Sequence, residues 1–159
     1  MSGFGLGSTP SMVMSSAVNV DASTPFVAAA DGNLALLQQA LKQLNGSVHQ
    51  VDENGYTLLH AGASYSQLAV MQWLLGQKVN LAAVDAEGDS ALHYASTVQA
   101  CRLLVEAGIN PQLRNMKGRT ALETKQEELR QEQEEEDDYD EDDPDIVALK
   151  EVIQFLSTC

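Results

Sequence analysis

Apolar residues occur along the chain in short groups with helical spacing, and turns marked by Gly and Asp separate these groups. From about Thr24 onward the groups form pairs. Residues 70–75 and 101–105 each carry an apolar face with the period of a helix. Small residues such as those at 61–63 precede the larger groups and allow neighbouring helices to approach closely. The pattern predicts an all-α fold built from short paired helices.

One stretch of sequence recurs at a fixed interval. Residues 52–61 (DENGYTLLHA) return 33 positions later as residues 85–94 (DAEGDSALHY), and residues 115–122 (NMKGRTAL) open a third copy. Residues 25–37 match the helical half of an earlier unit. This period is typical of a solenoid, in which each unit buries its apolar face against its neighbours.

The recurring residues have a physical explanation. The Asp-x-x-Gly corner favours a tight turn, because Gly adopts a positive φ easily and the Asp carboxylate can accept hydrogen bonds from nearby backbone N–H groups. Thr57, Ser90 and Thr120 follow the turn glycines by two positions. Each therefore stands where the N-cap of the next helix is expected.

These segments resemble ankyrin repeats. The family pattern Thr-Pro-Leu-His-x-Ala appears as residues 57–62 (TLLHAG) and 90–95 (SALHYA), with the proline replaced in both. The resemblance implies an all-α ankyrin-repeat solenoid of helix-turn-helix units joined by β-hairpin-like turns, with about three to four repeats. The step from Gly88 to Gly118 is 30 residues, three short of the period. We therefore expect a tighter turn between the two helices of that unit and a shallower binding surface there.

The chain divides into four predicted parts. Residues 1–22 are rich in Gly and Ser and are expected to form a disordered N-terminal tail. Residues 23–133 hold the ankyrin repeats, and residues 134–144 form an acidic insertion expected to be disordered. Residues 145–159 are predicted to form a C-terminal capping helix, the second helix of a fourth unit. Its apolar face is formed by Ile146, Leu149, Val152, Ile153 and Leu156.

The acidity of the chain belongs to one segment. The net charge is −14, but residues 127–145 hold 13 of the 23 acidic side chains and one basic one, Arg130. With nine Lys and Arg in total, the chain is not expected to bind nucleic acid directly. The candidate acidic binding segment comprises Glu134, Glu135, Glu136, Asp137, Asp138, Tyr139, Asp140, Glu141, Asp142 and Asp143, in which the Tyr139 ring could contact a partner's Lys or Arg.

The residues give little support for enzyme chemistry. His60 and His93 lie one period apart, and each imidazole is expected to tie its turn to neighbouring backbone; no third ligand with zinc spacing accompanies them. Cys101 is expected to face the core. The sequence also shows no phosphate-binding loop. On these grounds together we predict that the protein is not an enzyme and that it binds no cofactor or metal. Without an export signal or a transmembrane run, a monomer in the cytoplasm, the nucleus or both is expected.

The leading hypothesis is an adaptor that binds a protein partner through its repeat turns and concave helical face. One alternative is a dedicated chaperone or carrier for a basic protein, such as a ribosomal protein or histone, that uses the acidic segment. A second alternative is a regulatory subunit that occludes an enzyme. The candidate contact residues lie at the turns and on the first helices: Asp52, Glu53, Asn54, Tyr56, Tyr65, Asp85, Glu87, Asp89, Tyr94, Met116, Lys117 and Arg119. Tyr56, Tyr65 and Arg119 rank first, because Tyr and Arg are common interface anchors.

Overall fold

The structure is a computed structural model that describes residues 19–135 and 137–159. Most of the predicted tail, residues 1–18, therefore lies outside the described residues, as does Glu136. The described parts of the chain form these helices: α2 (Thr24–Asp31), α3 (Leu34–Gln43), α4 (Leu58–Ser64), α5 (Leu68–Gly76), α6 (Ala91–Tyr94), α7 (Val98–Ala107), α8 (Ala121–Glu135) and α9 (Pro144–Leu156). None of these helices is long and apolar enough to cross a membrane.

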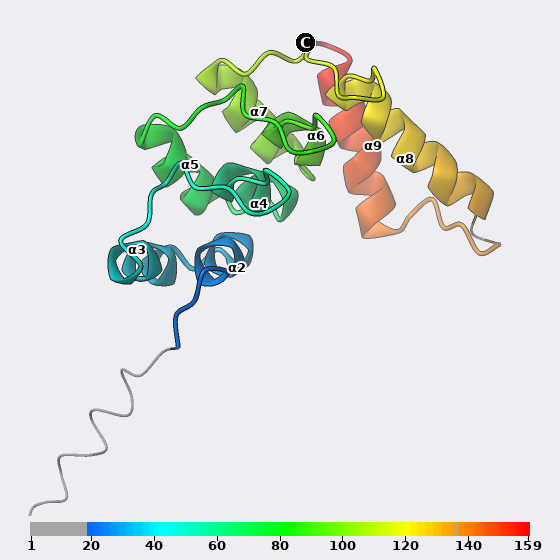
Figure 1. The fold of residues 1–159 in the computed structure, drawn as a ribbon. Coiled ribbons are helices and arrows are strands. Elements are labelled where there is room, and N and C mark those ends of the chain that lie inside the picture. The colour runs from blue at the N-terminus through cyan, green and yellow to red at the C-terminus, as the bar shows by residue number, and fades with distance from the viewer. Residues whose placement is uncertain (1–18, 136) are drawn as a thin grey trace, which may run out of the picture.

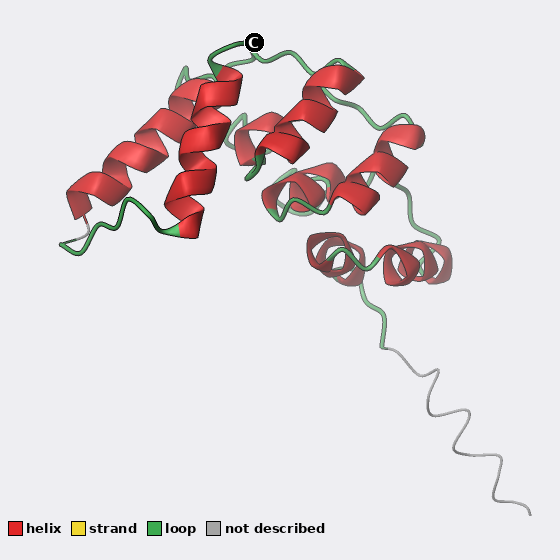
Figure 2. Ribbon diagram, turned by 180° about the vertical axis from the view of Figure 1, so that it is seen from behind, coloured by secondary structure: helices red, strands yellow, loops and turns green. Residues whose placement is uncertain are grey.

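The helices stack in two layers, as Figures 1 and 2 show. In one layer α2 contacts α4, α4 contacts α6, and α6 contacts α8; in the other, α5 contacts α7 and α7 contacts α9. Each first helix thus packs on the first helix of the next unit, and from the second unit on each second helix packs on the next second helix. The predicted all-α repeat solenoid is confirmed.

A continuous apolar core runs between the two layers. Its largest fully buried apolar side chains come from successive units: Leu37, Leu58, Met71, Leu74, Leu92 and Leu104. Cys101 is also fully buried, as predicted. The close helix spacing depends on small residues, since a Cβ atom added at Gly62 would lie 3.1 Å from Cγ of Met71. Burial against neighbouring units is what stabilises helices this short, because they are too short to be stable alone.

Side chains at the predicted caps begin the first helices. Thr57 Oγ1 accepts a hydrogen bond from the backbone N–H of His60, and Thr120 Oγ1 accepts one from Glu123. The Glu123 carboxylate in turn accepts from the backbone N–H of Thr120, which completes a capping box. The cap positions inferred from the sequence are confirmed at these two helices.

The shortened unit differs from the prediction. The expectation of a tighter turn between its helices is wrong, because residues 95–97 connect α6 to α7 with the same length as residues 65–67 between α4 and α5. The first helix is shortened in its place: α4 has seven residues and α6 has four. Loss of nearly one helical turn removes first-helix surface and leaves the length of the connection unchanged.

Helices α8 and α9 form the helix pair of a fourth unit. They contact one another, and each packs on the corresponding helix of the preceding unit. The predicted apolar face of α9 is observed: Ile146, Val152 and Leu156 are buried, and Leu149 and Ile153 are half-buried. This pair covers the C-terminal end of the stack, at the upper right of Figure 1.

The boundaries of the predicted acidic insertion shift. Helix α8 continues through Glu135, two residues into the segment expected to be disordered, because Arg130 donates to both Glu127 and Glu134 and offsets repulsion between them. Helix α9 begins at Pro144, where Asp143 accepts from the backbone N–H of Asp145. Residues 137–143 form turns between the two helices, and their disorder stays a prediction.

Candidate functional site

Three turns with the same hydrogen-bond pattern project from the stack. In the first turn, Asp52 Oδ1 accepts from the backbone N–H groups of Asn54 at 2.8 Å and Tyr56 at 2.9 Å. The backbone N–H of Asp52 donates to the carbonyl of Tyr56, and Gly55 takes a positive φ of 73°. The corner predicted from Asp and Gly is therefore observed.

The second and third turns repeat this pattern. Asp85 Oδ1 accepts from the N–H groups of Glu87 and Asp89, both at 2.9 Å. Asn115 Oδ1 accepts from Lys117 and Arg119, both at 3.0 Å. An amide therefore holds the same turn as a carboxylate, so the second carboxylate oxygen of the Asp turns is not needed for the backbone geometry.

Backbone hydrogen bonds join the tips of successive turns. Ala86 N–H donates to the carbonyl of Asn54 at 2.7 Å, and Met116 N–H donates to the carbonyl of Glu87 at 2.9 Å. Gly88 makes the second approach possible, since a Cβ atom there would lie 2.8 Å from the backbone nitrogen of Met116. The three turns thus form one connected array.

Two buried histidines couple the units beneath the turns. The N–H of Thr57 donates to Nδ1 of His60 at 3.1 Å, so Nε2 carries the proton and donates to the carbonyl of Asp89 at 2.8 Å. Likewise Nε2 of His93 lies 3.0 Å from the carbonyl of Arg119. The predicted structural role of both histidines is confirmed. Among the described residues, no group of three or more His, Cys, Asp or Glu could hold a metal ion.

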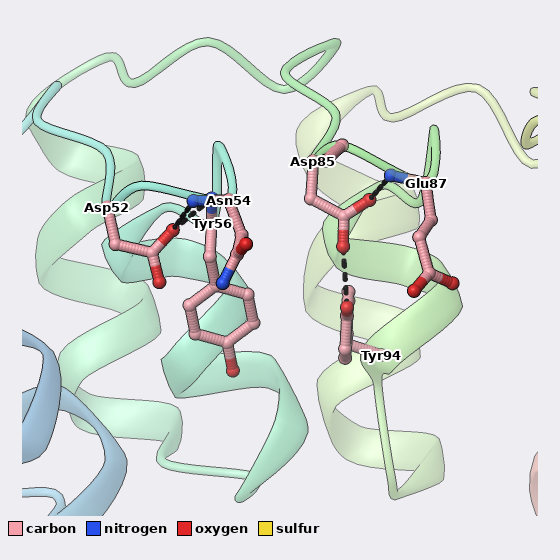
Figure 3. A pocket seen from close by; sticks show the side chains of 7 residues that line it. Asp52, Asn54, Tyr56, Asp85, Glu87 and Tyr94 are labelled. Carbon is pink, nitrogen blue, oxygen red and sulfur yellow. Dashed lines mark hydrogen bonds between the residues drawn. The ribbon is translucent and has the colours of Figure 1, made fainter.

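An open hollow of about 420 Å³ lies between the first two turns (Figure 3). Its lining comes from both turns and from the end of α6: Asp52, Asn54, Tyr56, Asp85, Ala86, Glu87 and Tyr94. The rings of Tyr56 and Tyr94 meet edge to face with centroids 5.3 Å apart. The hollow therefore combines aromatic walls with carboxylates and an amide.

A hydrogen bond from Tyr94 favours the charged form of the Asp85 carboxylate in the hollow. Its hydroxyl donates to Asp85 Oδ2 at 2.5 Å, opposite the oxygen that holds the turn. Burial favours the neutral form of Asp85, but the hydrogen bonds from Tyr94 and from the backbone of Asp89 and Glu87 outweigh it and lower the pKa of the carboxyl. Burial and this contact raise the pKa of Tyr94. At neutral pH the pair is a carboxylate and a neutral phenol.

Four carboxylates of the first two turns have no cationic partner within the described residues. No ion pair there involves Asp52, Glu53, Asp85 or Glu87. Glu53 and Glu87 are exposed at the turn tips. This part of the surface therefore presents uncompensated negative charge.

The third turn has a different character. Met116 is 79% exposed and Lys117 is exposed beside it. Arg119 lies 3.9 Å from the Glu127 carboxylate, and Arg114 pairs with Glu123 at 2.9 Å. The surface thus changes from acidic at the first two turns to apolar and basic at the third.

Two of the predicted contact residues, Tyr65 and Asp89, do not line the hollow. Tyr65 is exposed at the C-terminal end of α4 and does not line the hollow. Asp89 lines no part of the hollow, and its carboxylate accepts from Nδ2 of Asn115 at 2.8 Å. Asp89 thus links the second and third turns.

The acidic segment partly interacts with its own chain. The ring of Tyr139, predicted to receive a partner's cation, has Nζ of Lys150 5.7 Å from its centroid. Its hydroxyl accepts from Gln133. Asp140 and Asp143 accept from backbone N–H groups of nearby residues. These contacts leave fewer free groups for a partner than the sequence suggested.

Sequence reasoning missed a second hollow at the N-terminal end of the stack, lined partly by exposed Val27, Leu44 and Val51. One signal was available: a Val precedes the turn Asp in both complete copies, as Val51 and Val84. Both valines are exposed. Recurrence alone did not distinguish an exposed position from a buried one.

The paired helices, the hydrogen-bonded turns and the inter-unit histidines define a helical repeat protein. The family model for ankyrin repeats matches three copies over residues 25–115, which is 91 of the 159 residues. The chain belongs to the ankyrin-repeat family, whose repeats are generally protein–protein interaction modules and typically not enzymes. Comparison with curated proteins returns no matching sequence.

Proposed function

We propose that this protein is an adaptor that binds a protein partner across its three repeat turns, and that a basic segment of the partner occupies the hollow between the first two. The observation that carries the proposal is this hollow, in which two tyrosine rings and unpaired carboxylates face the same open space.

Contacts within the chain hold the turns without a partner. Hydrogen bonds hold each turn internally, and backbone bonds from Ala86 and Met116 link each turn to the preceding one. A surface that is already ordered loses little conformational entropy on binding, so more of the contact energy appears as affinity.

The chemistry of the hollow fits an arginine or lysine side chain. A guanidinium is planar, donates five hydrogen bonds and stacks on aromatic rings, and the hollow offers the rings of Tyr56 and Tyr94 beside Asp85. Glu53 and Glu87 at the tips would attract further cations and raise the association rate. The exposed Met116 and Lys117 then favour apolar or acidic residues further along the partner.

Partners would be captured from native extract with the intact chain and then measured against a turn variant, Asp52→Asn/Asp85→Asn/Glu87→Gln. Asn115 already holds the third turn with an amide, so this variant removes charge and keeps the turn geometry. We expect the affinity of the main partner to fall at least tenfold, which corresponds to about 1.4 kcal/mol.

The matched control neutralises the other acidic region. In it, residues 134–143 are replaced by a Gly/Ser linker of equal length, and the adaptor proposal expects nearly unchanged affinity. The opposite result, with binding lost in the linker variant and kept in the turn variant, would instead assign recognition to the acidic segment. That outcome is the one expected of a chaperone for a basic protein.

A further inference from the structure

A largely apolar groove of about 820 Å³ opens at the N-terminal end of the stack, beside α2. One wall is formed by Ala22, Ser23, Phe26 and Val27, and the other by Leu44, Gly46 and residues 50–53. Val27 and Val51 are 52% and 54% exposed. The volume lies within the range of about 300–1,000 Å³ typical of ligand clefts, so several side chains fit in it.

The groove lies at the open end of the solenoid. Helices α8 and α9 cover the other end, whereas no element of the described residues packs outside α2 and α3. Terminal units of solenoids usually present a polar outer face, since apolar surface there has no next unit to cover it. The exposed apolar side chains of Val27, Leu44 and Val51 depart from this rule. Covering them would remove apolar surface from water.

The chain itself supplies a segment next to the groove. Residues 1–18 precede Ala22 and Ser23, which already form part of its wall. Asp21 fixes where that segment joins the fold, because its carboxylate accepts from the backbone N–H and hydroxyl groups of both Ser23 and Thr24. The described chain begins at residue 19, three residues before the wall of the groove.

The composition of this segment matches the groove. Residues 1–20 carry no charged side chain, and they contain Phe4, Leu6 and the consecutive run Met12-Val13-Met14 among Gly and Ser. Met side chains are flexible and fill irregular apolar surfaces well. An uncharged segment can enter an apolar groove without the cost of removing charges from water.

We propose that residues 1–18 fold back into this groove, with the Met12-Val13-Met14 run packed against Val27, Leu44 and Val51. The seven residues from 15 to 21 that separate the run from Ala22 can span about 23 Å when extended, which is enough to turn back across a groove of this size. Tethering gives the run an effective concentration of about a millimolar, so weak contacts suffice to keep it bound.

The groove adjoins the proposed interaction surface. Asp52 and Glu53 line the groove and also belong to the first turn. The docking of the segment does not depend on the proposed function.

Paramagnetic broadening in the full-length chain tests the docking without any partner. A nitroxide is attached at Ser11→Cys in a Cys159→Ser background; Cys101 is fully buried and stays unlabelled. The methyl signals of Leu44 and Val51 should be broadened at least threefold more than in the same chain carrying Met12→Ser, Val13→Ser and Met14→Ser. The tether has the same length in both chains, so equal broadening would overturn the proposal.

Two further measurements complete the test. The matched control, Phe4→Ser/Leu6→Ser, should retain the broadening, and its loss there in place of the Met12–Met14 variant would overturn the assignment of the run. Mixing nitroxide-labelled chains with isotopically labelled, nitroxide-free chains should give no broadening. If the mixture reproduces the effect, the segment of a second copy fills the groove and the intramolecular proposal is wrong.

Discussion

The imidazole of His60 donates from Nε2 to the backbone carbonyl of Asp89, 29 residues later, at 2.8 Å. Its other nitrogen, Nδ1, accepts from the N–H and lies 2.6 Å from the hydroxyl of Thr57. One buried side chain therefore joins the cap of its own helix to the turn of the next unit. His93 repeats the arrangement toward Arg119.

Replacing this histidine should destabilise the whole stack. His60→Ala leaves the Asp89 carbonyl without its donor and opens a cavity, so the free energy of unfolding should fall by about 2–4 kcal/mol. Urea denaturation followed by circular dichroism measures it. His49→Ala is the control: His49 is exposed, and its removal should change stability by less than about 0.5 kcal/mol. Equal effects of the two substitutions would contradict the coupling role.

The same histidine should make stability depend on pH. Burial lowers the pKa of His60 below its usual 6.5, against hydrogen bonding to Asp89 and nearby carboxylates, which act in the opposite direction. Below about pH 6.5 the unfolded chain thus binds a proton that the folded chain resists, so its contribution to stability is complete above that pH and declines as the pH falls. Urea midpoints at pH 7.5, 6.5 and 5.5 would measure this.

A His60→Gln variant provides the reference for the pH measurement. It should be less stable at every pH but should lose less stability than the parent chain between pH 7.5 and 5.5. If the two chains lose the same amount, other groups cause the pH dependence and the burial of a neutral imidazole is not responsible.

Because the turn tips are in contact, replacing Gly88 and replacing Gly118 should lower the free energy of unfolding by different amounts. Gly88 and Gly118 have similar positive φ values, 81° and 74°, but a Cβ atom at Gly88 would meet Met116 and Asn115, whereas at Gly118 it would meet nothing within 4 Å. Gly118→Ala should therefore cost about 1 kcal/mol from backbone strain. Gly88→Ala should cost roughly 2–4 kcal/mol, because the second and third turns must also separate. Equal costs in thermal or urea unfolding would mean that the tips are not held together.

The sequence allowed the period, the turns and the role of both histidines to be predicted, because each depends on residue types at fixed spacing. The three missing residues were wrongly assigned to the turn between α6 and α7. Either the turn or the first helix can be shortened by such a deletion, and the sequence carries no signal that separates these two cases. The groove beside α2 was missed for another reason: Val27, Leu44 and Val51 come from three separate segments that meet only in the folded chain.

The lining of the candidate hollow was anticipated in part from the sequence. Its residue types were anticipated at both turns, but the edge-to-face contact of Tyr56 with Tyr94 and the bond from Tyr94 to Asp85 join different units, and a single repeat does not reveal them. Asp89 was expected at the surface because of its turn position. Its link to Asn115 depends on how closely the next turn stacks.

Lys125 is a charged residue at a buried position, so its contribution to stability can be tested. It is 6% exposed in α8, seven residues after the turn glycine, where the two preceding units have Gly62 and Ala95. Its ammonium contacts only Glu128 among the described carboxylates, at 3.1 Å. Because removing a charge from water can cost more than one such pair returns, Lys125→Met should leave the free energy of unfolding unchanged or raise it by about 1 kcal/mol.

Two companion variants separate packing from charge at this position. Lys125→Ala should lower the free energy of unfolding by about 1–2 kcal/mol, since it removes the buried aliphatic stem that Met would keep. Arg130→Ala, which breaks exposed ion pairs on the same helix, should change it by less than about 0.5 kcal/mol. A loss of more than 1 kcal/mol in Lys125→Met would instead show that the pair with Glu128 outweighs its desolvation. Urea denaturation of all three variants measures their free energies of unfolding. The outcomes can be told apart because both the size of each change and the ranking of the three variants differ between them.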